Sequence, residues 1–322
     1  MNKYYYAYYK KDEIRNSASG GIGHALAMDV LNKSGIVYGV SYSDDFKSAQ
    51  YLRINEINKI EKLSGSKYIT AEKRMPDGSF VFENVKKDLK DKKLVLFTGL
   101  PCEIAALNNY LDRQGIDTEK EKMITVDLIC QGPLSSKEQS QYIEFLEKKY
   151  KSRLIDFTVR YKNPYWKPVY LKAVFENGKK HIKPLYETDF GRAFLIYGKE
   201  GCFHCKYKNE NHQADITIGD FWGIKENENG YNKMGTSVVV THTEKGNDTF
   251  KQLANICFGE VTEDKAIDKN SMYGNSREKY SNYATFKSSY LKNDLHKAVF
   301  DSRSILSKVK YLLKLLLGLK PY

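Results

Sequence analysis

The stretch Leu94-Val95-Leu96-Phe97-Thr98-Gly99-Leu100-Pro101-Cys102 decides the fold class. Residues 94–98 form a continuous apolar run that stops at Gly99, which is typical of a strand buried on both faces of a sheet. Pro101 follows where the first position of a helix is expected, because proline lacks the N–H that a helix start leaves unpaired. A strand that leads directly into a helix predicts an α/β fold.

The next two elements repeat this order. Residues 123–130 predict another buried strand, and Ser135-x-x-Glu138 is a capping box that opens a second helix. The two strands are therefore expected to be parallel, with a right-handed crossover between them. Cys102 and Cys130 would then both lie just past the carboxyl ends of neighbouring strands, where sites in such sheets form.

The pattern changes between residues 154 and 185. Residues 155–161 and 169–175 alternate and are rich in aromatics, and Glu176-Asn177-Gly178 provides a turn, which predicts an antiparallel insertion. The tyrosine-rich residues 4–9 indicate an edge strand. The predicted fold is thus α/β, with a parallel or mixed sheet core, an antiparallel aromatic-rich insertion and a C-terminal helical tail.

Four of the five cysteines suggest a metal site. Cys202 and Cys205 form a Cys-x-x-Cys pair, and Cys102 and Cys130 at the strand ends would complete a four-thiolate set. Four thiolates hold either zinc or an iron–sulfur cluster, and spacing does not separate the two.

The fifth cysteine, Cys257, is expected to be structural. Phe250, Leu253, Ala254 and Cys257 fall at helical spacing, which predicts a buried small residue on a core helix. An odd number of widely spaced cysteines and no signal-peptide pattern argue against a disulfide framework and predict a reducing, cytoplasmic setting.

The stretch Ser17-Ala18-Ser19-Gly20-Gly21 precedes an apolar helical pattern in residues 22–30. Free N–H groups, the helix dipole and two hydroxyls at a helix start suit a phosphate. The alternative is a simple Ser19 N-cap with glycines that reverse the chain, and the sequence leaves both open.

Positive charge is concentrated at the end of the chain. Of the net +12, residues 277–322 contribute +7, from ten Lys or Arg against Glu278, Asp294 and Asp301. Such a tail suits peripheral contact with an anionic membrane or an acidic partner, with a solvated face as the alternative. No nucleic-acid-binding signature accompanies the charge. The apolar run at residues 311–319 is about half a bilayer span and predicts a terminal helix docked on the body.

A colinear set of motifs identifies a family. The motifs are, in order, Ser17-Ala18-Ser19-Gly20-Gly21, Gly65-Ser66-Lys67-Tyr68, Gly99-Leu100-Pro101-Cys102, Asp127-Leu128-Ile129-Cys130-Gln131-Gly132, the Cys-x-x-Cys pair, and Ala214-Asp215-Ile216-Thr217-Ile218-Gly219-Asp220-Phe221-Trp222-Gly223. This set resembles the coenzyme F420 hydrogenase/dehydrogenase beta-subunit family over roughly residues 4–245.

The resemblance implies FAD and a 4Fe-4S cluster. The residues expected to bind the flavin are Ser17, Ser19, Gly20, Gly21, Gly65, Ser66, Lys67 and Gly99, and the expected cluster ligands are Cys102, Cys130, Cys202 and Cys205. Lys67 is expected to contact the flavin or its phosphates, with a plain surface lysine as the alternative. The placement of Cys102 at a helix start is expected to favour its thiolate. The implied division is a flavin-binding half (1–90), an iron–sulfur half (91–258) and a basic helical tail (259–322).

Two departures from the family limit the resemblance. Longer members carry an N-terminal ferredoxin-like module that this sequence lacks, so a separate ferredoxin-type donor is expected. Many members have Cys-His-Gly where this chain has Cys130-Gln131-Gly132. His24 and His204 are candidates to replace that catalytic histidine, and the alternative for each is an ordinary polar or surface role.

The predicted function is that of an iron–sulfur flavoprotein oxidoreductase. Electrons would pass from the ferredoxin-type donor through a 4Fe-4S cluster and FAD to a small organic acceptor. Short bacterial members resembling this chain accompany surface-polysaccharide synthesis, which suggests that setting. The alternative is a zinc-stapled scaffold, or an assembly partner of a polysaccharide-synthesis enzyme, without redox chemistry.

Overall fold

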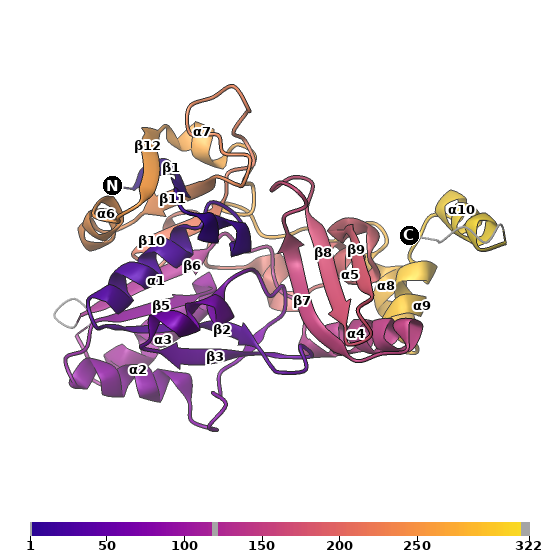
Figure 1. Ribbon diagram of the computed structural model, residues 1–322, viewed down its shortest axis with the longest axis horizontal. Helices are drawn as coiled ribbons and strands as arrows, with labels where there is room; N and C mark the ends of the chain where they lie inside the picture. Colours follow the sequence, from indigo (N-terminus) through magenta and orange to yellow (C-terminus); the bar gives the residue numbers. More distant parts are fainter. Residues whose placement is uncertain (1, 118–121, 317–322) are drawn as a thin grey trace.

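The computed structural model describes residues 2–117 and 122–316. Within these residues, nine strands form one mixed sheet in the order β12-β1-β11-β10-β6-β5-β2-β3-β4, and three form a second sheet, β7-β8-β9. Figure 1 shows the large sheet with α1, α2, α3 and α6 on the left, and the small sheet with α4, α5, α8 and α9 on the right. The predicted α/β class, with its mixed core, antiparallel insertion and helical tail, is confirmed.

The strands have the following bounds: β1 (Lys3–Tyr9), β2 (Ile36–Tyr42), β3 (Ala49–Ile54), β4 (Ala71–Glu72), β5 (Val95–Gly99), β6 (Met123–Leu128), β7 (Leu154–Tyr161), β8 (Tyr170–Phe175), β9 (Lys180–Pro184), β10 (Ile216–Asp220), β11 (Ser237–Thr241) and β12 (Ile256–Val261). The α-helices are α1 (Ile22–Asn32), α2 (Val81–Lys90), α3 (Pro101–Arg113), α4 (Ser136–Tyr150), α5 (Asp189–Ile196), α6 (Glu244–Lys251), α7 (Glu263–Ile267), α8 (Tyr283–Tyr290), α9 (Leu295–Asp301) and α10 (Ile305–Leu316).

The central strands pair as the sequence predicts. β5 and β6 are parallel, with Gly99 opposite Asp127, and α3 begins at Pro101. Ser135 caps α4, since its N–H donates to the Glu138 carboxylate at 2.7 Å. Because Gly99 and Asp127 are paired, Cys102 and Cys130 each lie three residues beyond the same level of the sheet, at its carboxyl edge.

The N-terminal strand is not at the edge, so that prediction was wrong. β1 pairs antiparallel with both β11 and β12, and β12 is the edge strand. The expected helix through Cys257 was also wrong. α6 ends at Lys251, Asn255 has a positive φ of 59° that redirects the chain, and Cys257 lies half-buried on β12 opposite Tyr8.

The second sheet shares a core with the C-terminal helices. This core includes Phe157, Leu171, Phe190, Phe286 and Val299, each at most 3% exposed. α8 and α9 of the predicted tail are therefore part of the body. The predicted division at residues 90 and 258 stays a prediction, although strands from residues 3–72 and 95–261 share one sheet.

The predicted terminal helix, residues 311–319, is described as far as Leu316, where it is the end of α10, and residues 317–319 lie outside the described residues. Tyr311 contacts the body, with its ring centre 5.4 Å from that of Phe300. Ile305 and Leu306 at the start of α10 are 79% and 76% exposed. No described helix is long and apolar enough to cross a bilayer.

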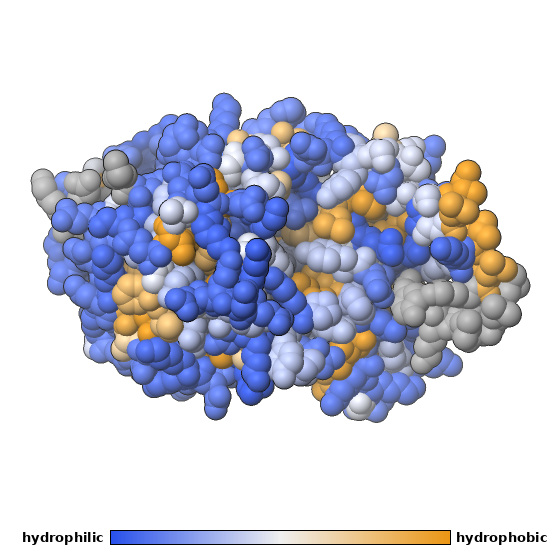
Figure 2. Space-filling view, turned by 90° about the horizontal axis from the view of Figure 1, so that it is seen from above, coloured by the Kyte–Doolittle hydropathy of each residue, from blue (hydrophilic) through white to orange (hydrophobic). Residues whose placement is uncertain are grey.

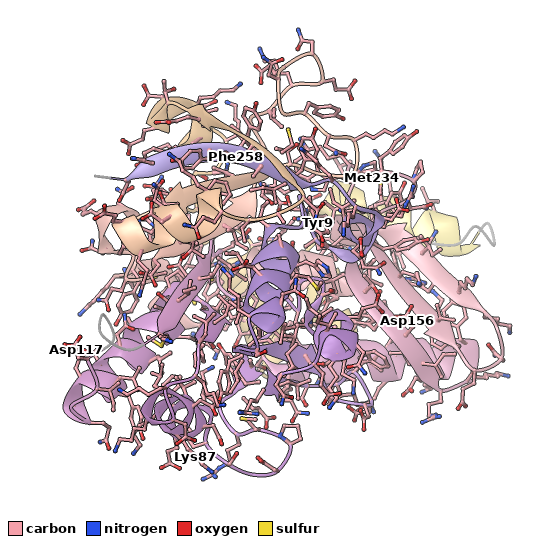
Figure 3. The ribbon with its side chains drawn as sticks, turned by 60° about the vertical axis from the view of Figure 1, so that its left-hand side comes forward. Tyr9, Lys87, Asp117, Asp156, Met234 and Phe258 are labelled. Atoms are coloured by element: carbon pink, nitrogen blue, oxygen red, sulfur yellow. The ribbon has the colours of Figure 1, made fainter. Side chains whose placement is uncertain are left out.

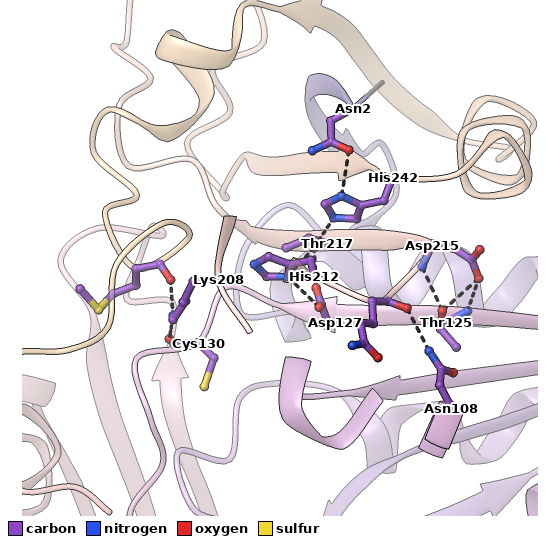
Figure 4. Close-up of polar contacts among 12 residues, drawn as sticks. Asn2, Asn108, Thr125, Asp127, Cys130, Lys208, His212, Asp215, Thr217 and His242 are labelled. Carbon is purple, nitrogen blue, oxygen red and sulfur yellow. Dashed lines mark hydrogen bonds and ion pairs between the residues drawn. The ribbon is translucent and has the colours of Figure 1, made fainter. Parts of the chain in front are cut away.

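The Asp215 side chain connects two strands and a turn. Its carboxylate accepts hydrogen bonds from the Thr125 N–H at 2.9 Å and the Thr125 hydroxyl at 3.0 Å (Figure 4). It also accepts a hydrogen bond from the Thr243 hydroxyl at 2.7 Å. Lys245 adds an ion pair at 3.2 Å. The side chain thus connects β6, β10 and the turn between β11 and α6.

Asp215→Ala is expected to lower the free energy of unfolding by about 2–3 kcal/mol, because it leaves the buried Thr125 donors unpaired. Urea unfolding measures the change. Asp248→Ala, at an exposed position on α6, is the matched control and should change stability by less than about 0.5 kcal/mol. Equal effects of the two changes would contradict the structural role of Asp215.

Candidate functional site

The Ser-Gly-Gly loop opens α1, as predicted. Gly21 is the N-cap residue, with a left-handed φ of 82° that favours glycine. Ser19 is not the cap, because its hydroxyl donates to the Thr236 carbonyl at 3.0 Å. The simple Ser19 N-cap alternative is therefore wrong.

Gly20 lies against the large sheet. Its carbonyl accepts from the Tyr9 N–H at 2.7 Å, and its N–H donates to the Ser237 hydroxyl at 3.0 Å. A Cβ on Gly20 would lie 2.5 Å from the Ala7 carbonyl oxygen. Figure 3 shows Tyr9 beside the start of α1, where β1 passes the loop. Gly20 is thus required for close backbone packing.

The Gly65-Ser66-Lys67 loop lies beside the Ser-Gly-Gly loop. A Cβ on Gly65 would be 3.9 Å from the Asn16 carbonyl oxygen, which leaves room at this position. Lys67 Nζ donates to the carbonyls of Leu63, Ser64 and Gly65 at 3.0, 2.7 and 3.2 Å. Burial lowers the pKa of Lys67 to about 7. In this arrangement the lysine holds the loop's own backbone.

Arg160, which the sequence analysis missed, joins the two loops. Its guanidinium donates to the Ala18 carbonyl at 3.1 Å and to the Tyr68 hydroxyl at 3.2 Å. It also pairs with the Asp220 carboxylate at 2.6 Å. Burial alone would lower the pKa of Arg160, but Asp220 and Tyr68 together more than offset this and raise it. One cation from β7 therefore positions both predicted flavin loops.

Lys162 is a second cation behind the Ser-Gly-Gly loop. Its ammonium donates to the carbonyls of Ile14 and Ser19 at 2.5 and 2.8 Å. Burial, and then the charge of Arg160, lower the pKa of Lys162 to about 7. This lysine therefore changes charge near neutral pH.

Two stacked tryptophans lie next to these cations. Trp166 and Trp222 stack with ring centres 5.4 Å apart and planes 15° apart. Lys167 Nζ lies 4.3 Å from the Trp166 ring centre, and Trp166 donates to Asp220 at 3.1 Å. Trp166 is only 2% exposed, so the partly exposed Trp222 is the ring of this pair that a planar ligand could reach.

Gly99 is the one predicted flavin residue on another element. It ends β5, and a Cβ there would lie 2.8 Å from the Tyr51 hydroxyl. That hydroxyl donates to Glu103 at 2.8 Å. Its environment gives Gly99 a packing role beside α3.

Two of the four cysteines, Cys130 and Cys202, lie against Gly132. The Gly132 N–H donates to Cys130 Sγ at 3.3 Å, and a Cβ on Gly132 would lie 3.0 Å from Cys202 Sγ. Cys102 is in the first turn of α3, and Cys205 directly follows the 3-10 helix Glu200–His204. The charges of Cys202 and Cys205 both act on Cys102, so the four thiols share one region. Gly132, with a φ of 103°, permits this approach.

Burial raises the pKa of three of the four thiols, Cys102, Cys130 and Cys202. Burial raises the pKa of Cys130 to about 12 and also raises that of Cys202. Desolvation, and then the charge of Glu103, raise the pKa of the exposed Cys102 to about 11. Both effects disfavour a Cys102 thiolate, and the expectation that the helix start favours one stays a prediction.

Two buried cations lie next to the thiols. Lys208 donates to the Cys130 carbonyl at 2.7 Å, and Arg277 donates to the carbonyls of Gly132 and Leu195 at 3.4 and 2.7 Å. Positive charge favours thiolates, so the donor set and its surroundings suit a thiolate-ligated metal or cluster. Among the described residues, no three His, Cys, Asp or Glu side chains are already arranged as metal ligands.

The two parts of the site are in contact. The Leu134 N–H, four residues after Cys130, donates to the Tyr68 carbonyl at 3.0 Å. Tyr68 also stacks on Phe194, with ring centres 4.2 Å apart, and the Phe194 carbonyl accepts from Arg277 at 3.0 Å. Tyr68 therefore links the Arg160 cluster to the cysteine region.

The predicted catalytic histidines are not brought together. His24 is half-buried on α1 with its ring 5.4 Å from that of Tyr9, and burial lowers its pKa. His204 is exposed between the paired cysteines. Neither arrangement tests a catalytic role.

A buried polar chain near Cys130 was also missed. Asp127 is fully buried and binds His212 at 2.8 Å and the Thr217 hydroxyl at 2.5 Å, and that hydroxyl contacts His242 at 2.7 Å (Figure 4). Polar residues within an apolar strand pattern were the available signal.

A mixed α/β sheet with cysteines gathered near the carboxyl ends of its central strands defines the class of fold. The family model for the C-terminal region of the coenzyme F420 hydrogenase/dehydrogenase beta subunit matches residues 92–265, more than half of the chain. The chain belongs to this family.

A solved structure supports the fold. A chain of the xenon-derivatised F420-reducing [NiFe] hydrogenase complex from Methanosarcina barkeri matches with a TM-score of 0.57 and 16% sequence identity. The match covers 99% of this chain and 95% of that one. No protein of curated function matches the sequence.

Gly20→Val is expected to lower the free energy of unfolding by about 3 kcal/mol or more, because the added side chain would meet strand backbone that has no room to move. Ser66→Ala, in the neighbouring loop, is the control and should be close to neutral. Thermal and urea unfolding measure both. A stable Gly20→Val variant would show that the loop does not pack against the sheet as described.

Proposed function

We propose that this chain is an iron–sulfur flavoprotein oxidoreductase. Family membership supports the coarser statement, an oxidoreductase-related subunit. The finer one is supported by the contacts of Cys130 and Cys202 with Gly132 and by the electrostatic interaction of Cys102 with Cys202 and Cys205. Tyr68 connects this region to two loops that Arg160 holds together.

The four cysteines would hold a 4Fe-4S cluster, which supplies one-electron transfer when bound. Lys208 and Arg277 would offset the negative charge of the four thiolates. Lys208 donates to the Cys130 carbonyl and Arg277 to the Gly132 carbonyl, so both cations already lie beside this segment.

FAD would lie against the loops of residues 17–21 and 65–67, and it couples one-electron to two-electron chemistry when bound. The N-terminus of α1 would receive its phosphates. Arg160 and Lys162 provide positive charge behind that loop, and Trp222 provides an aromatic surface beside it.

The electron donor we propose is a ferredoxin-type protein, and the acceptor a small organic molecule, with surface-polysaccharide metabolism as the setting. The similar solved chain comes from a multi-subunit hydrogenase complex, which supports a partner protein. The net charge of +12 suits an acidic carrier. We place this chemistry in the cytoplasm, where thiols stay reduced.

The first test is metal and flavin content after anaerobic purification. The wild-type chain should contain iron, sulfide and FAD. Cys102→Ser, Cys130→Ser, Cys202→Ser and Cys205→Ser should each lose most of the iron, whereas Cys257→Ser, half-buried on β12, should keep it.

Zinc in place of iron, with no flavin, would support the scaffold alternative, because four thiolates suit zinc equally well. Full iron occupancy in two or more of the four serine variants would exclude these cysteines as the ligand set.

FAD affinity is expected to fall as pH rises above 7. A nearby phosphate favours the ammonium form of Lys162 and so raises its pKa in the complex above the value of about 7 in the free protein. Between these two pKa values FAD binding takes up a proton, and the affinity falls by at most about tenfold per pH unit. Lys162→Arg keeps the charge at every pH and should remove this pH dependence while retaining binding. Flavin titration from pH 6 to 9 measures both, and an unchanged slope in Lys162→Arg would refute the role of Lys162.

A further inference from the structure

The last described helix, α10, lies beyond α8 and α9 at the end of the molecule, away from the large sheet (Figure 1). Its apolar side chains are not covered. Those with the largest exposure are Ile305 (79%), Leu306 (76%), Val309 (48%), Leu312 (47%) and Leu313 (51%). Figure 2 shows a hydrophobic region at the end of the molecule where α10 lies, and further hydrophobic regions elsewhere on the same face.

The exposed residues form one face of the helix. At about 100° per residue, the five fall within an arc of about 120°. Tyr311 lies outside this arc and faces the body, with its ring centre 5.4 Å from that of Phe300 and 4.7 Å from the Arg303 guanidinium carbon. Tyr311 therefore holds the helix so that its apolar face points away from the protein.

Charge borders this face on both sides. By the same helical spacing, Lys308 and Lys310 flank the arc, one on each side. From Arg303 to the end of the sequence there are five Lys or Arg and no Asp or Glu. A helix with an apolar face between lysines, and no acid, has the composition of a helix that lies in a membrane interface.

We propose that α10 is a membrane anchor that lies in the plane of an anionic lipid bilayer. The apolar face would enter the boundary between headgroups and acyl chains, and Lys308 and Lys310 would reach the lipid phosphates. A lipid surface fits better than a second helix, because a coiled-coil partner is usually selected by charges of both signs beside the apolar seam. The described part of the helix, Ile305–Leu316, is shorter than a bilayer span, which favours a position in the plane of the membrane.

This anchoring is independent of the proposed redox function. α10 lies beyond α8 and α9, away from α3, which carries Cys102, and from β7, which carries Arg160 (Figure 1), so substitutions on its exposed face do not touch these elements. Loss of anchoring and loss of cofactor binding are therefore separable measurements on the same full-length protein.

The test is co-sedimentation of the full chain with vesicles of phosphatidylcholine alone or mixed in equal parts with phosphatidylglycerol. We expect binding to the anionic vesicles that is at least about tenfold stronger than to phosphatidylcholine, and that weakens as salt shortens the Debye length from about 10 Å at 0.1 M to about 3 Å at 1 M. Leu312→Glu/Leu313→Glu should abolish binding to both. Lys308→Glu/Lys310→Glu should remove the preference for phosphatidylglycerol.

The matched control is Lys87→Glu/Lys90→Glu, which makes the same charge change on exposed positions of α2, at the opposite end of the molecule (Figure 3). This control should bind as wild type. Binding that both helix variants retain would overturn the proposal. Absence of vesicle binding by the wild-type protein would also overturn it. If, in addition, gel filtration showed that Leu312→Glu/Leu313→Glu converts a dimer to a monomer, the apolar face would be an interface between two copies of this chain.

Discussion

The buried ion pair between Arg160 and Asp220 is the constraint on which the site depends. The arginine comes from the small sheet and the aspartate from the end of β10 in the large one, and the Arg160 side chain is only 3% exposed. A charge so far from water is tolerated only when it is fully paired, and here Ala18 and Tyr68 take its remaining donors. The positions of both sheets and both loops are thus specified by one guanidinium.

The cysteine region shows a different balance of charge. Burial raises the pKa of Cys130 and Cys202 and lowers that of the neighbouring Lys208 and Arg277, so burial disfavours charge on every one of these groups. A thiolate would favour the charged form of Lys208 or Arg277 beside it, and a charged Lys208 or Arg277 would favour the thiolate. Deprotonation of the thiols by a bound metal and full ionisation of Lys208 and Arg277 therefore reinforce one another.

Local patterns predicted the parallel β5-α3-β6 unit and the clustering of Cys102 and Cys130, because apolar runs, caps and the polarity of parallel strands are encoded over short distances. Contacts between distant segments were not predictable in this way. Arg160 was hidden in an aromatic strand, although it shares a strand face with Lys162, and two cations on one strand face were the available signal. Cys257 was misassigned because the helical spacing of apolar residues continues past Asn255, where the chain turns. The strand after that turn is stabilised by pairing with β1, a contact between distant segments.

The place of β1 in the sheet has a consequence for synthesis on the ribosome. The strand Lys3–Tyr9 emerges more than 220 residues before both of its neighbours, β11 and β12, which lie in residues 237–261. At about 5–20 residues per second, an apolar tyrosine-rich segment waits on the order of 10–50 s for its partners. During that time both of its edges can pair with other chains. The nascent chain therefore depends on chaperones or on fast translation more than its ordinary size suggests.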